Sequence, residues 1–182
     1  AVLYASADGV GEITLNRPEN RNSMTEDVLE GLQAAIEKLR ADGDLRCVII
    51  TGRGRSFCAG ADFKSGAQRG GEGLAPHERS MAMYEPFLGV LEIEVPVIAA
   101  VHGYCLGGGV GLVGNADIII ASEDASFGLP EVDQGALGAA THLARLVPAH
   151  RMRAMVYTAA RASAQELHRY GSVLKVVPRD EL

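Results

Sequence analysis

Three consecutive glycines, Gly107, Gly108 and Gly109, constrain the fold of this chain more than any other feature of its sequence. They closely follow an apolar run at residues 95–101, which predicts a strand buried on both faces. Residues 107–115 are predicted to form a short helix. Glycine has no Cβ, and the first N–H groups of a helix lack intrahelical partners. This junction therefore suits an oxygen that gains negative charge during a reaction.

Two other interpretations of the glycine-rich segment carry less weight. Residues 109–114 spell G-x-G-x-x-G, a pattern of dinucleotide-binding proteins. Only about two helical turns fit before the next strand begins at Asp117, however, whereas a Rossmann crossover helix is longer. The glycines could also serve only to pack a helix tightly on a sheet. That explanation suffices for one glycine, but a run of three after a buried strand favours a role that faces a ligand.

A second loop with small residues lies upstream, at residues 56–62, and it also follows a predicted buried strand. If the two strands are parallel, their loops leave the same edge of the sheet, and each can direct one N–H group at the same oxygen. Such a pair of donors is an oxyanion hole, in which one donor typically contributes roughly 3–4 kcal/mol of transition-state stabilisation.

Strand-like and helix-like segments alternate along the chain, which predicts an α/β fold with mostly parallel pairing. A capping box at residues 23–26 and helical spacing to Leu39 predict the first helix, which Gly43 would end. Residues 66–73 are predicted to form a mobile loop, and residues 127–138 form a loop that carries Glu131 and Asp133. The predicted strands are residues 10–15, 47–51, 95–101, 117–121 and 173–177, and the further helices are residues 76–91, 139–146, 151–159 and 164–170.

Composition limits the classes of protein that fit. The 182 residues suit one domain, and a net charge of −6 argues against a general nucleic-acid binder. No transmembrane segment, signal peptide or metal-ligand spacing is recognisable. The three cysteines, Cys47, Cys58 and Cys105, form no disulfide framework, which indicates a reduced, intracellular protein with small buried thiols.

Several segments in this order resemble the crotonase, or enoyl-CoA hydratase/isomerase, superfamily. The resemblance implies an α/β fold built as a spiral of ββα units with mostly parallel strands, and it covers residues 1–182 as a crotonase core. The matching segments are Ile-Thr-Leu-Asn-Arg-Pro at 13–18, Ser-Phe-Cys-Ala-Gly-Ala-Asp at 56–62, Pro-Val-Ile-Ala-Ala-Val-His-Gly at 96–103, Gly-Gly-Gly at 107–109, Asp-Ile at 117–118 and Phe-Gly-Leu-Pro-Glu at 127–131.

The resemblance implies an enzyme that holds an acyl-CoA thioester and stabilises its enolate. Ala61 and Gly108 match the two residues whose N–H groups form the oxyanion hole, and Glu131 matches a catalytic acid/base. CoA is expected as part of the substrate, with no other cofactor and no metal. The expected substrate-binding residues are Arg21 at the CoA phosphates, Ala59 at the adenine, Asp62 and Gly107 in the two loops, and Gly138, which matches a glycine that helps hold water.

One position departs from the hydratases of the superfamily. They carry a second glutamate three residues after the middle glycine of the triplet, and this chain has Gly111 there. A single Glu131 suits a proton shuttle between two carbons, as in enoyl-CoA isomerases, so isomerase- or hydratase-type chemistry is the main expectation. Asp133 would add a carboxylate only if its loop curled, and a solvated aspartate is the simpler interpretation.

Two alternatives remain open. Residues 109–146 are similar to a branch of the superfamily that hydrolytically opens a ring on CoA, a retro-Claisen cleavage of a cyclic β-keto thioester. The other alternative is a non-catalytic protein that only binds acyl-CoA. For other reactive side chains the simple interpretations are preferred: Cys58 as a buried thiol, His102 as a hydrogen-bonded structural histidine, and Asp117 as the residue that orders entry to its strand.

The resemblance also implies properties of the assembled protein. A homotrimer or dimer of trimers, a cytoplasmic location, a role in fatty acid metabolism, and no nucleic-acid or membrane partner are expected. Superfamily members usually continue with helices that cover the acyl pocket and build the trimer. We therefore expect that this C-terminal helical region lies beyond Leu182 and that Ala1 is not the start of the protein.

Overall fold

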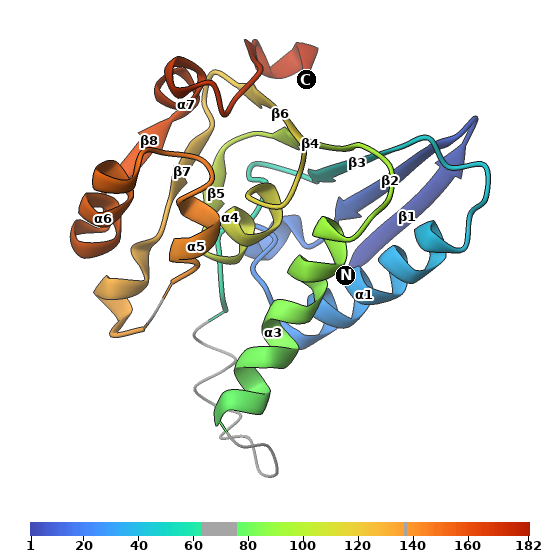
Figure 1. Cartoon of the computed structure of the whole chain (residues 1–182), viewed down its shortest axis with the longest axis horizontal. Coiled ribbons are helices and arrows are strands. Elements are labelled where there is room, and N and C mark those ends of the chain that lie inside the picture. Colours follow the sequence, from blue (N-terminus) through green and yellow to red (C-terminus); the bar gives the residue numbers. More distant parts are fainter. Residues whose placement is uncertain (63–75, 137) are drawn as a thin grey trace.

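The computed structural model describes residues 1–62, 76–136 and 138–182, and it describes no side chains for residues 76–83. The expected mobile loop at residues 66–73 lies outside the described residues. The main feature is a six-stranded sheet with the order β1-β2-β3-β4-β6-β9 (Figure 1). Its strands are β1 (Val2–Ala7), β2 (Val10–Leu15), β3 (Cys47–Gly52), β4 (Val97–Val101), β6 (Ile118–Ser122) and β9 (Lys175–Val177).

All neighbouring strands of this sheet run parallel except β1 and β2, which form an antiparallel hairpin. This confirms the predicted α/β class with mostly parallel pairing. The prediction that β4 is buried on both faces is wrong in detail, because its residues alternate between buried and half-buried. Alternate residues of β3 are also buried and half-buried, because helices cover only one face at this point. Strand β1 was not predicted from the sequence.

A second, three-stranded sheet is made of strands too short to give a pattern in the sequence. It consists of β5 (Tyr104–Leu106), β7 (Ser126–Gly128) and β8 (Arg161–Ser163), in the order β5-β7-β8. Strand β5 directly precedes the glycine triplet, and β7 directly precedes the segment that carries Glu131. The parallel pairing of β5 with β7 therefore brings these two segments side by side.

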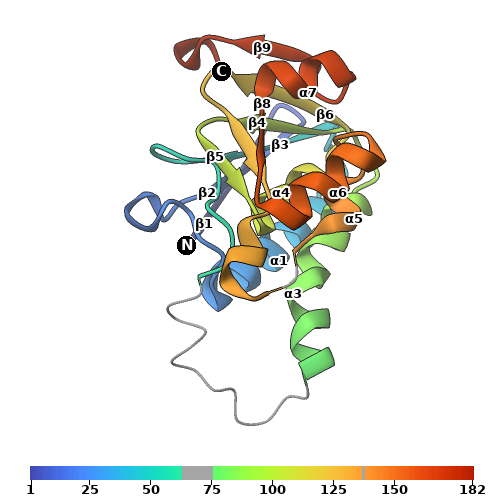
Figure 2. The ribbon, with the colours of Figure 1, turned by 90° about the vertical axis from the view of Figure 1, so that its left-hand side faces the viewer.

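Two long helices pack together beneath the main sheet, as Figures 1 and 2 show from two directions. They are α1 (Glu26–Arg40) and α3 (Pro76–Leu91), and Pro86 lies inside α3. The capping-box prediction is wrong, because α1 begins after Thr25 rather than Ser23 and Thr25 makes no side-chain capping bond. Helix α1 ends at Arg40 with Ala41 as its C-cap, so Gly43 is not the residue that ends it.

The remaining helices are short. They are α4 (Gly108–Val113), α5 (Ala140–Leu143), α6 (Ala149–Thr158) and α7 (Ala164–Tyr170), with 3-10 turns η1 (Pro18–Asn20), η2 (Pro130–Gln134) and η3 (Arg179–Glu181). The segment predicted as a loop at 127–138 thus begins as strand β7 and continues as η2. Helices α6 and α7 gather with β8 at one end of the molecule (Figure 1). No helix among the described residues is long and apolar enough to cross a membrane.

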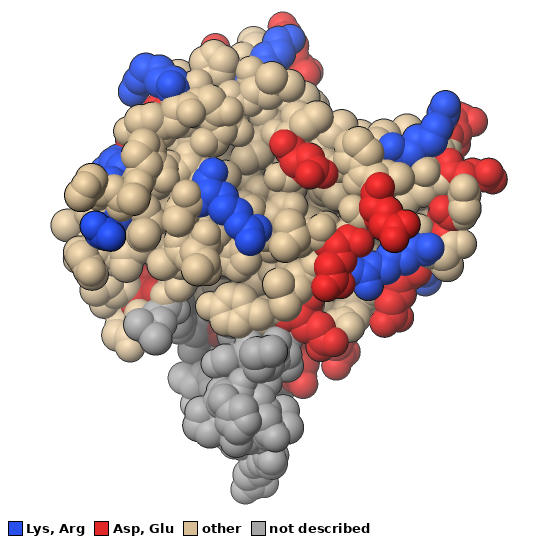
Figure 3. All heavy atoms as spheres, in the orientation of Figure 1, with Lys and Arg blue, Asp and Glu red and all other residues tan. Residues whose placement is uncertain are grey.

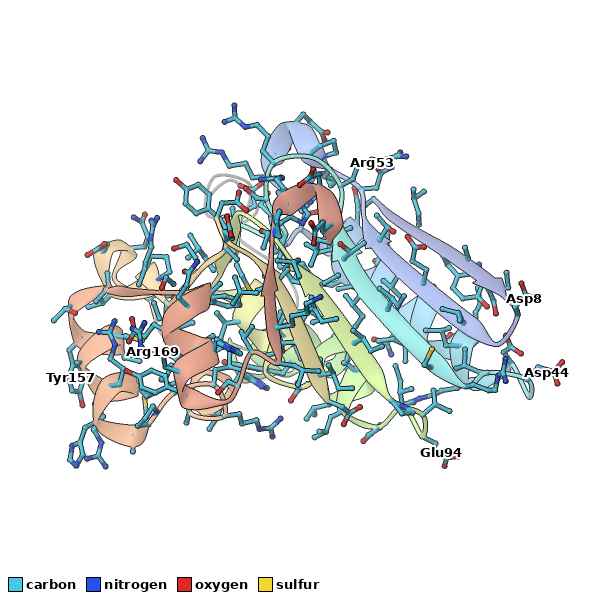
Figure 4. All side chains as sticks on the ribbon, turned by 90° about the horizontal axis from the view of Figure 1, so that it is seen from above. Asp8, Asp44, Arg53, Glu94, Tyr157 and Arg169 are labelled. Atoms are coloured by element: carbon cyan, nitrogen blue, oxygen red, sulfur yellow. The ribbon has the colours of Figure 1, made fainter. Side chains whose placement is uncertain are left out.

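Labelled side chains in Figure 4 mark the two ends of the parallel strands of the main sheet. Arg53 follows β3 at its carboxyl end, whereas Asp8, Asp44 and Glu94 lie at the opposite end of the sheet (Figure 4). On the face in Figure 3, acidic and basic side chains are interspersed on the side of the main sheet and of α1. The loop after β3 therefore leaves the main sheet at the end away from these three acidic residues.

Candidate active site

Two loops meet at a pair of glycines. Gly60 and Gly107 both have positive φ angles, of 91° and 53°. A Cβ on Gly107 would lie 3.2 Å from the Cα of Gly60, and a Cβ on Gly60 would lie 3.2 Å from the carbonyl oxygen of Leu106. Only glycine permits backbones to touch in this conformation. The next residues, Ala61 and Gly108, are therefore carried to the same place, as the sequence predicted for the two loops.

Backbone hydrogen bonds hold the upstream loop along β5. The N–H of Cys58 donates to the carbonyl of Tyr104 at 2.9 Å, and the N–H of Leu106 donates to the carbonyl of Cys58 at 2.9 Å. On its other side, the N–H of Met24 donates to the carbonyl of Gly60 at 2.8 Å. The loop is thus bonded on both edges.

The N–H groups of Ala61 and Gly108 have no acceptor among the described residues. Gly108 is the first residue of α4, where an N–H group has no intrahelical partner. Ala61 pairs with Met24 in a parallel bridge that uses the N–H of Asp62 and the carbonyl of Gly60 instead. Both donors are therefore available to an oxygen atom of a ligand.

Glu131 lies directly beside this pair of loops. A Cβ on Gly107 would lie 2.5 Å from Glu131 Oε1, and a Cβ on Gly138 would lie 2.8 Å from Glu131 Oε2. The residue is only 8% exposed, and Oε2 has no hydrogen-bond partner in the described part of the chain. Burial raises the pKa of this carboxyl group above its usual value of 4.5. A buried carboxylate with one oxygen unpartnered is suited to taking up a proton.

The 3-10 turn η2 aims Glu131 at the glycines. The N–H of Gly107 donates to the carbonyl of Gly128 at 3.0 Å, which fixes the end of β7 against the triplet. Pro130 opens the turn and Gly135 closes it in the left-handed conformation. Asp133, two residues after Glu131, is exposed, as the simpler interpretation of the sequence expected.

An aromatic ring fills the space beside Gly111, where hydratases of the superfamily carry a glutamate. A Cβ on Gly111 would lie 3.0 Å from Cδ2 and Cε2 of Phe87, and a Cβ on Gly108 would lie 3.4 Å from its Cζ. The Asn115 side chain donates to the carbonyl of Phe87 at 2.7 Å. Sequence analysis missed Phe87, which comes from α3. The glycines three residues apart in α4 were the one signal that a bulky neighbour packs there.

His142 extends this aromatic cluster from α5. Its ring stacks on Tyr84 and meets Phe87 edge to face, with centroid distances of 6.1 Å to each. The side chain is buried, and its Nδ1 has no partner within the described residues. Burial, and then the positive charge of Arg145, lower the pKa of His142, so the ring is neutral at pH 7.

The residues expected at the CoA moiety lie together. The N–H of Ala59 donates to the carbonyl of Arg21 at 3.0 Å, and Arg21 is exposed with a positive φ of 52°. Arg53 points outward at the same edge of the sheet (Figure 4). Asp62 follows Ala61 and is half-buried, and its N–H donates to the carbonyl of Met24 at 3.1 Å.

Cys58 and His102 have the structural roles that the sequence analysis expected. Cys58 is buried, which raises the pKa of its thiol to about 12, so it is no nucleophile at neutral pH. His102 shares a hydrogen bond of 3.1 Å with the carbonyl of Gly54. Asp117, which was expected to order entry to its own strand β6, instead accepts a bond of 2.8 Å from the N–H of Val97 at the start of the neighbouring strand β4. The described residues hold no cluster of His, Cys, Asp or Glu that could bind a metal ion.

Comparisons with known proteins identify the family of the chain. A family profile described as enoyl-CoA hydratase/isomerase matches residues 5–182. The chain is 48% identical over 176 residues to a (7aS)-7a-methyl-1,5-dioxo-2,3,5,6,7,7a-hexahydro-1H-indene-carboxyl-CoA hydrolase of Rhodococcus jostii, covering 96% of the chain and 67% of the relative. It is 40% identical over 176 residues to a mevalonyl-coenzyme A hydratase of Aspergillus fumigatus, covering 93% and 63%.

The fold comparison gives the same grouping. A crystal structure of an enoyl-CoA hydratase from Mycobacterium smegmatis matches with a TM-score of 0.91 and 30% identity, covering the whole chain and 71% of that structure. The chain spans 67% of the length of the Rhodococcus hydrolase and 63% of the length of the Aspergillus hydratase.

Proposed function

The chain belongs to the enoyl-CoA hydratase/isomerase family, and from this premise we propose that it binds an acyl-CoA thioester at the meeting point of the two loops. The N–H groups of Ala61 and Gly108 hold the thioester oxygen, and the contact between Gly60 and Gly107 supports this arrangement. Arg21 meets the CoA phosphates, Ala59 the adenine, and Asp62 orders the loop between them. CoA is part of the substrate, and no other cofactor takes part.

We propose that the reaction is the hydrolytic opening of a cyclic β-keto acyl-CoA thioester, with Glu131 as the acid/base. One observation carries this proposal: within the described part of the chain a single buried carboxylate faces the glycine pair, while Phe87 fills the space beside Gly111. The name of the Rhodococcus relative describes a hydrolase of a dioxo bicyclic CoA derivative, which supports the same class.

The proposed steps use one proton acceptor. Glu131 takes a proton from water, and the resulting hydroxide attacks the ketone carbon β to the thioester. The tetrahedral alkoxide collapses to a carboxylic acid and breaks the bond between the α and β carbons. The electron pair enters the thioester as an enolate, whose oxygen accepts from Ala61 and Gly108. Glu131 then returns its proton to the α carbon, so one water is consumed and the carboxylate is restored.

Gly107 and Gly138 leave room for the Glu131 carboxylate, which packs directly against both glycines. A side chain at either position would meet one of its oxygens. In the proposal, the water molecule lies beside Oε2, where the N–H of Gly138 helps to hold it. The raised pKa of Glu131 makes the carboxylate a stronger base than a solvated glutamate.

A second candidate is isomerisation of a 3-enoyl-CoA. The same single carboxylate favours it, because moving a proton between two carbons needs no bound water. Hydration of a 2-enoyl-CoA is less favoured, because Phe87 fills the space beside Gly111 that a second glutamate would need. A protein that only binds acyl-CoA would bind these thioesters without turnover.

One screen separates these functions. The protein is incubated with a cyclic β-keto acyl-CoA, a 3-enoyl-CoA and a 2-enoyl-CoA, and the products are identified by mass spectrometry. The proposed function predicts that the mass of the cyclic thioester increases by about 18 Da, the mass of one water. This product should be absent with Glu131→Gln and present with Asp133→Asn. A mass gain of the cyclic substrate that survives in Glu131→Gln overturns the role of Glu131. Turnover of the 3-enoyl-CoA alone replaces the main proposal with the second.

We further propose the homotrimer or dimer of trimers implied by the resemblance, and a cytoplasmic location with a role in fatty acid or related acyl-CoA metabolism. Exposed apolar residues support association: Tyr157 on α6 is 74% exposed and Leu174 before β9 is 65% exposed. Three free cysteines support a reducing compartment. Light scattering of the full-length protein tests the trimer.

A further inference from the structure

Asn22 lies at the centre of the loop that carries Ala61, although it belongs to a different segment of the chain. Its side chain is 0% exposed. Its Nδ2 donates toward the carbonyl oxygens of Arg53, Ser56 and Phe57, at 3.0, 2.9 and 3.1 Å. Its Oδ1 accepts from the N–H of Arg17 at 2.8 Å. One side chain therefore uses both its donor and its acceptor capacity in the interior.

The three carbonyls belong to one stretch of chain that turns from β3 into the Ala61 loop. No other group of the described residues bonds to all three. Gly52 makes room for the amide, because a Cβ there would lie 2.9 Å from Asn22 Nδ2 and 2.5 Å from the carbonyl oxygen of Phe57. The amide thus closes the turn from the inside.

The backbone around Asn22 is shaped for this contact. Arg21 and Asn22 are both in the left-handed conformation, with φ angles of 52° and 54°. Asparagine tolerates this region better than most residues. The turn also places the carbonyl of Arg21 and the N–H of Met24 as partners of Ala59 and Gly60. Residues 21–24 are therefore bonded to residues 53–60 by one side chain and by two backbone bonds.

We propose that Asn22 is a positioning residue that sets the direction of the Ala61 N–H group. The inference rests on the proposed oxyanion hole. A peptide N–H stabilises a developing oxyanion only when it is held in direction before the reaction. Asn22 fixes the carbonyls of Ser56 and Phe57, and the loop from there to Ala61 is four residues long. Without the amide, the carbonyls of Arg53, Ser56 and Phe57 lose the side-chain donor that they share. The bond from the Met24 N–H to the Gly60 carbonyl then holds the Ala61 peptide without support from the turn.

The test measures polarisation of a bound thioester, which a purely structural role would leave unchanged. A saturated acyl-CoA with a 13C-labelled thioester carbonyl is bound at saturating concentration, and its carbonyl stretch is recorded by infrared difference spectroscopy. Two donors at the oxygen lower the stretching frequency relative to the free thioester. We compare Asn22→Asp, which keeps the size and the acceptor, and Asn22→Ser, with wild type. Asn20→Asp, an exposed asparagine at the end of η1, is the matched control.

The expected result is a carbonyl band that moves back toward the free thioester in both Asn22 variants, while the control keeps the wild-type band. Turnover of a processed substrate is expected to fall roughly 10- to 100-fold in the Asn22 variants, as for a misplaced catalytic group. A folded Asn22 variant with the wild-type band overturns the inference. If neither variant unfolds cooperatively, Asn22 holds the whole fold and the specific positioning role is overturned too.

The outcome for Asn22 is separate from the outcome for the reaction. A wild-type protein that polarises the thioester but opens no ring disproves the proposed reaction, and loss of the band shift in Asn22→Asp then still supports the positioning role. A wild-type protein that binds the thioester with no band shift overturns the positioning role together with the oxyanion hole.

Discussion

The ring of Phe87 occupies the space that a side chain at residue 111 would need. A Cβ on Gly111 would lie 3.0 Å from two carbons of that ring, and Phe87 is only 2% exposed. The absence of a carboxylate at residue 111 is therefore tied to how Phe87 of α3 packs against α4. It is not a gap that a glutamate side chain could enter without rearrangement.

Introducing the second glutamate is thus expected to fail. Gly111→Glu should destabilise the protein by about 1–3 kcal/mol through overpacking, and should not produce hydration of a 2-enoyl-CoA. Urea unfolding measures the first effect and an absorbance assay of the enoyl thioester the second. Phe87→Ala alone should cost about 3–5 kcal/mol. Because it relieves the crowding, the double variant Gly111→Glu with Phe87→Ala should be more stable than the sum of the two single changes predicts. A stable single variant with hydratase activity would show that the ring does not exclude the carboxylate.

Replacing Glu131 should abolish turnover without loss of folding. Glu131→Gln keeps the size of the side chain but removes the proton acceptor, so we expect a decrease in kcat of about 10²- to 10⁴-fold. The unfolding free energy should stay within about 1 kcal/mol, because no hydrogen bond to Oε2 is lost. Steady-state kinetics and urea unfolding are compared with Asp133→Asn, the exposed neighbour, which should match wild type. Activity that is equal in both variants contradicts the role.

The raised pKa of Glu131 predicts a defined pH dependence of stability. The folded state holds this proton more tightly than the unfolded chain, whose carboxyl has a usual pKa of 4.5. The group therefore favours the folded state least at high pH, and its contribution to stability declines as pH rises from 4.5 through the folded-state pKa. The unfolding free energy of wild type minus that of Glu131→Gln should decrease over this window. A difference that rises or stays flat contradicts the direction of the shift.

The buried thiols should resist alkylation in the native protein. Cys58 and Cys105 are 0% exposed, and burial raises the pKa of Cys58 to about 12, whereas Cys47 is half-buried at the start of β3. Iodoacetamide at pH 8 should label Cys47 first, and mass spectrometry of peptides should find the other two modified only after unfolding. Rapid native labelling of Cys58 would mean that the Ala61 loop opens readily.

Local patterns predicted the regular parts of the fold well. Burial against the main sheet requires the apolar spacing of α1, and burial within that sheet requires the apolar runs of β3, β4 and β6. Both patterns are therefore visible in the sequence. The three-residue strands β5 and β8 have no period to detect. Thr25 rather than Ser23 precedes α1, because the chain before it is held in a left-handed turn at Arg21 and Asn22.

The candidate site was only partly visible in the sequence. The glycine triplet was proposed as a site because it follows a predicted strand, whereas Glu131 was proposed only through the resemblance to the family. Phe87 and His142 were missed as site neighbours because they come from α3 and α5, and only tertiary packing brings them to α4. Asn22 was missed for the same reason, since its three acceptors lie more than thirty residues away in the chain.

Gly138 offers a test of the space around the acid/base group. A Cβ there would lie 2.8 Å from Glu131 Oε2 and 3.0 Å from its Cδ, so Gly138→Ala must displace the carboxylate. We expect kcat to fall roughly 10- to 100-fold, because a small displacement of a catalytic group costs about that much. Gly43→Ala is the matched control, since a Cβ there meets nothing within 4 Å and its backbone needs no positive φ. The control should keep wild-type kinetics, measured in the same steady-state assay. Wild-type kcat in Gly138→Ala would mean that Glu131 does not act from the position seen in the structure, because its carboxylate could not stay there beside the new methyl group.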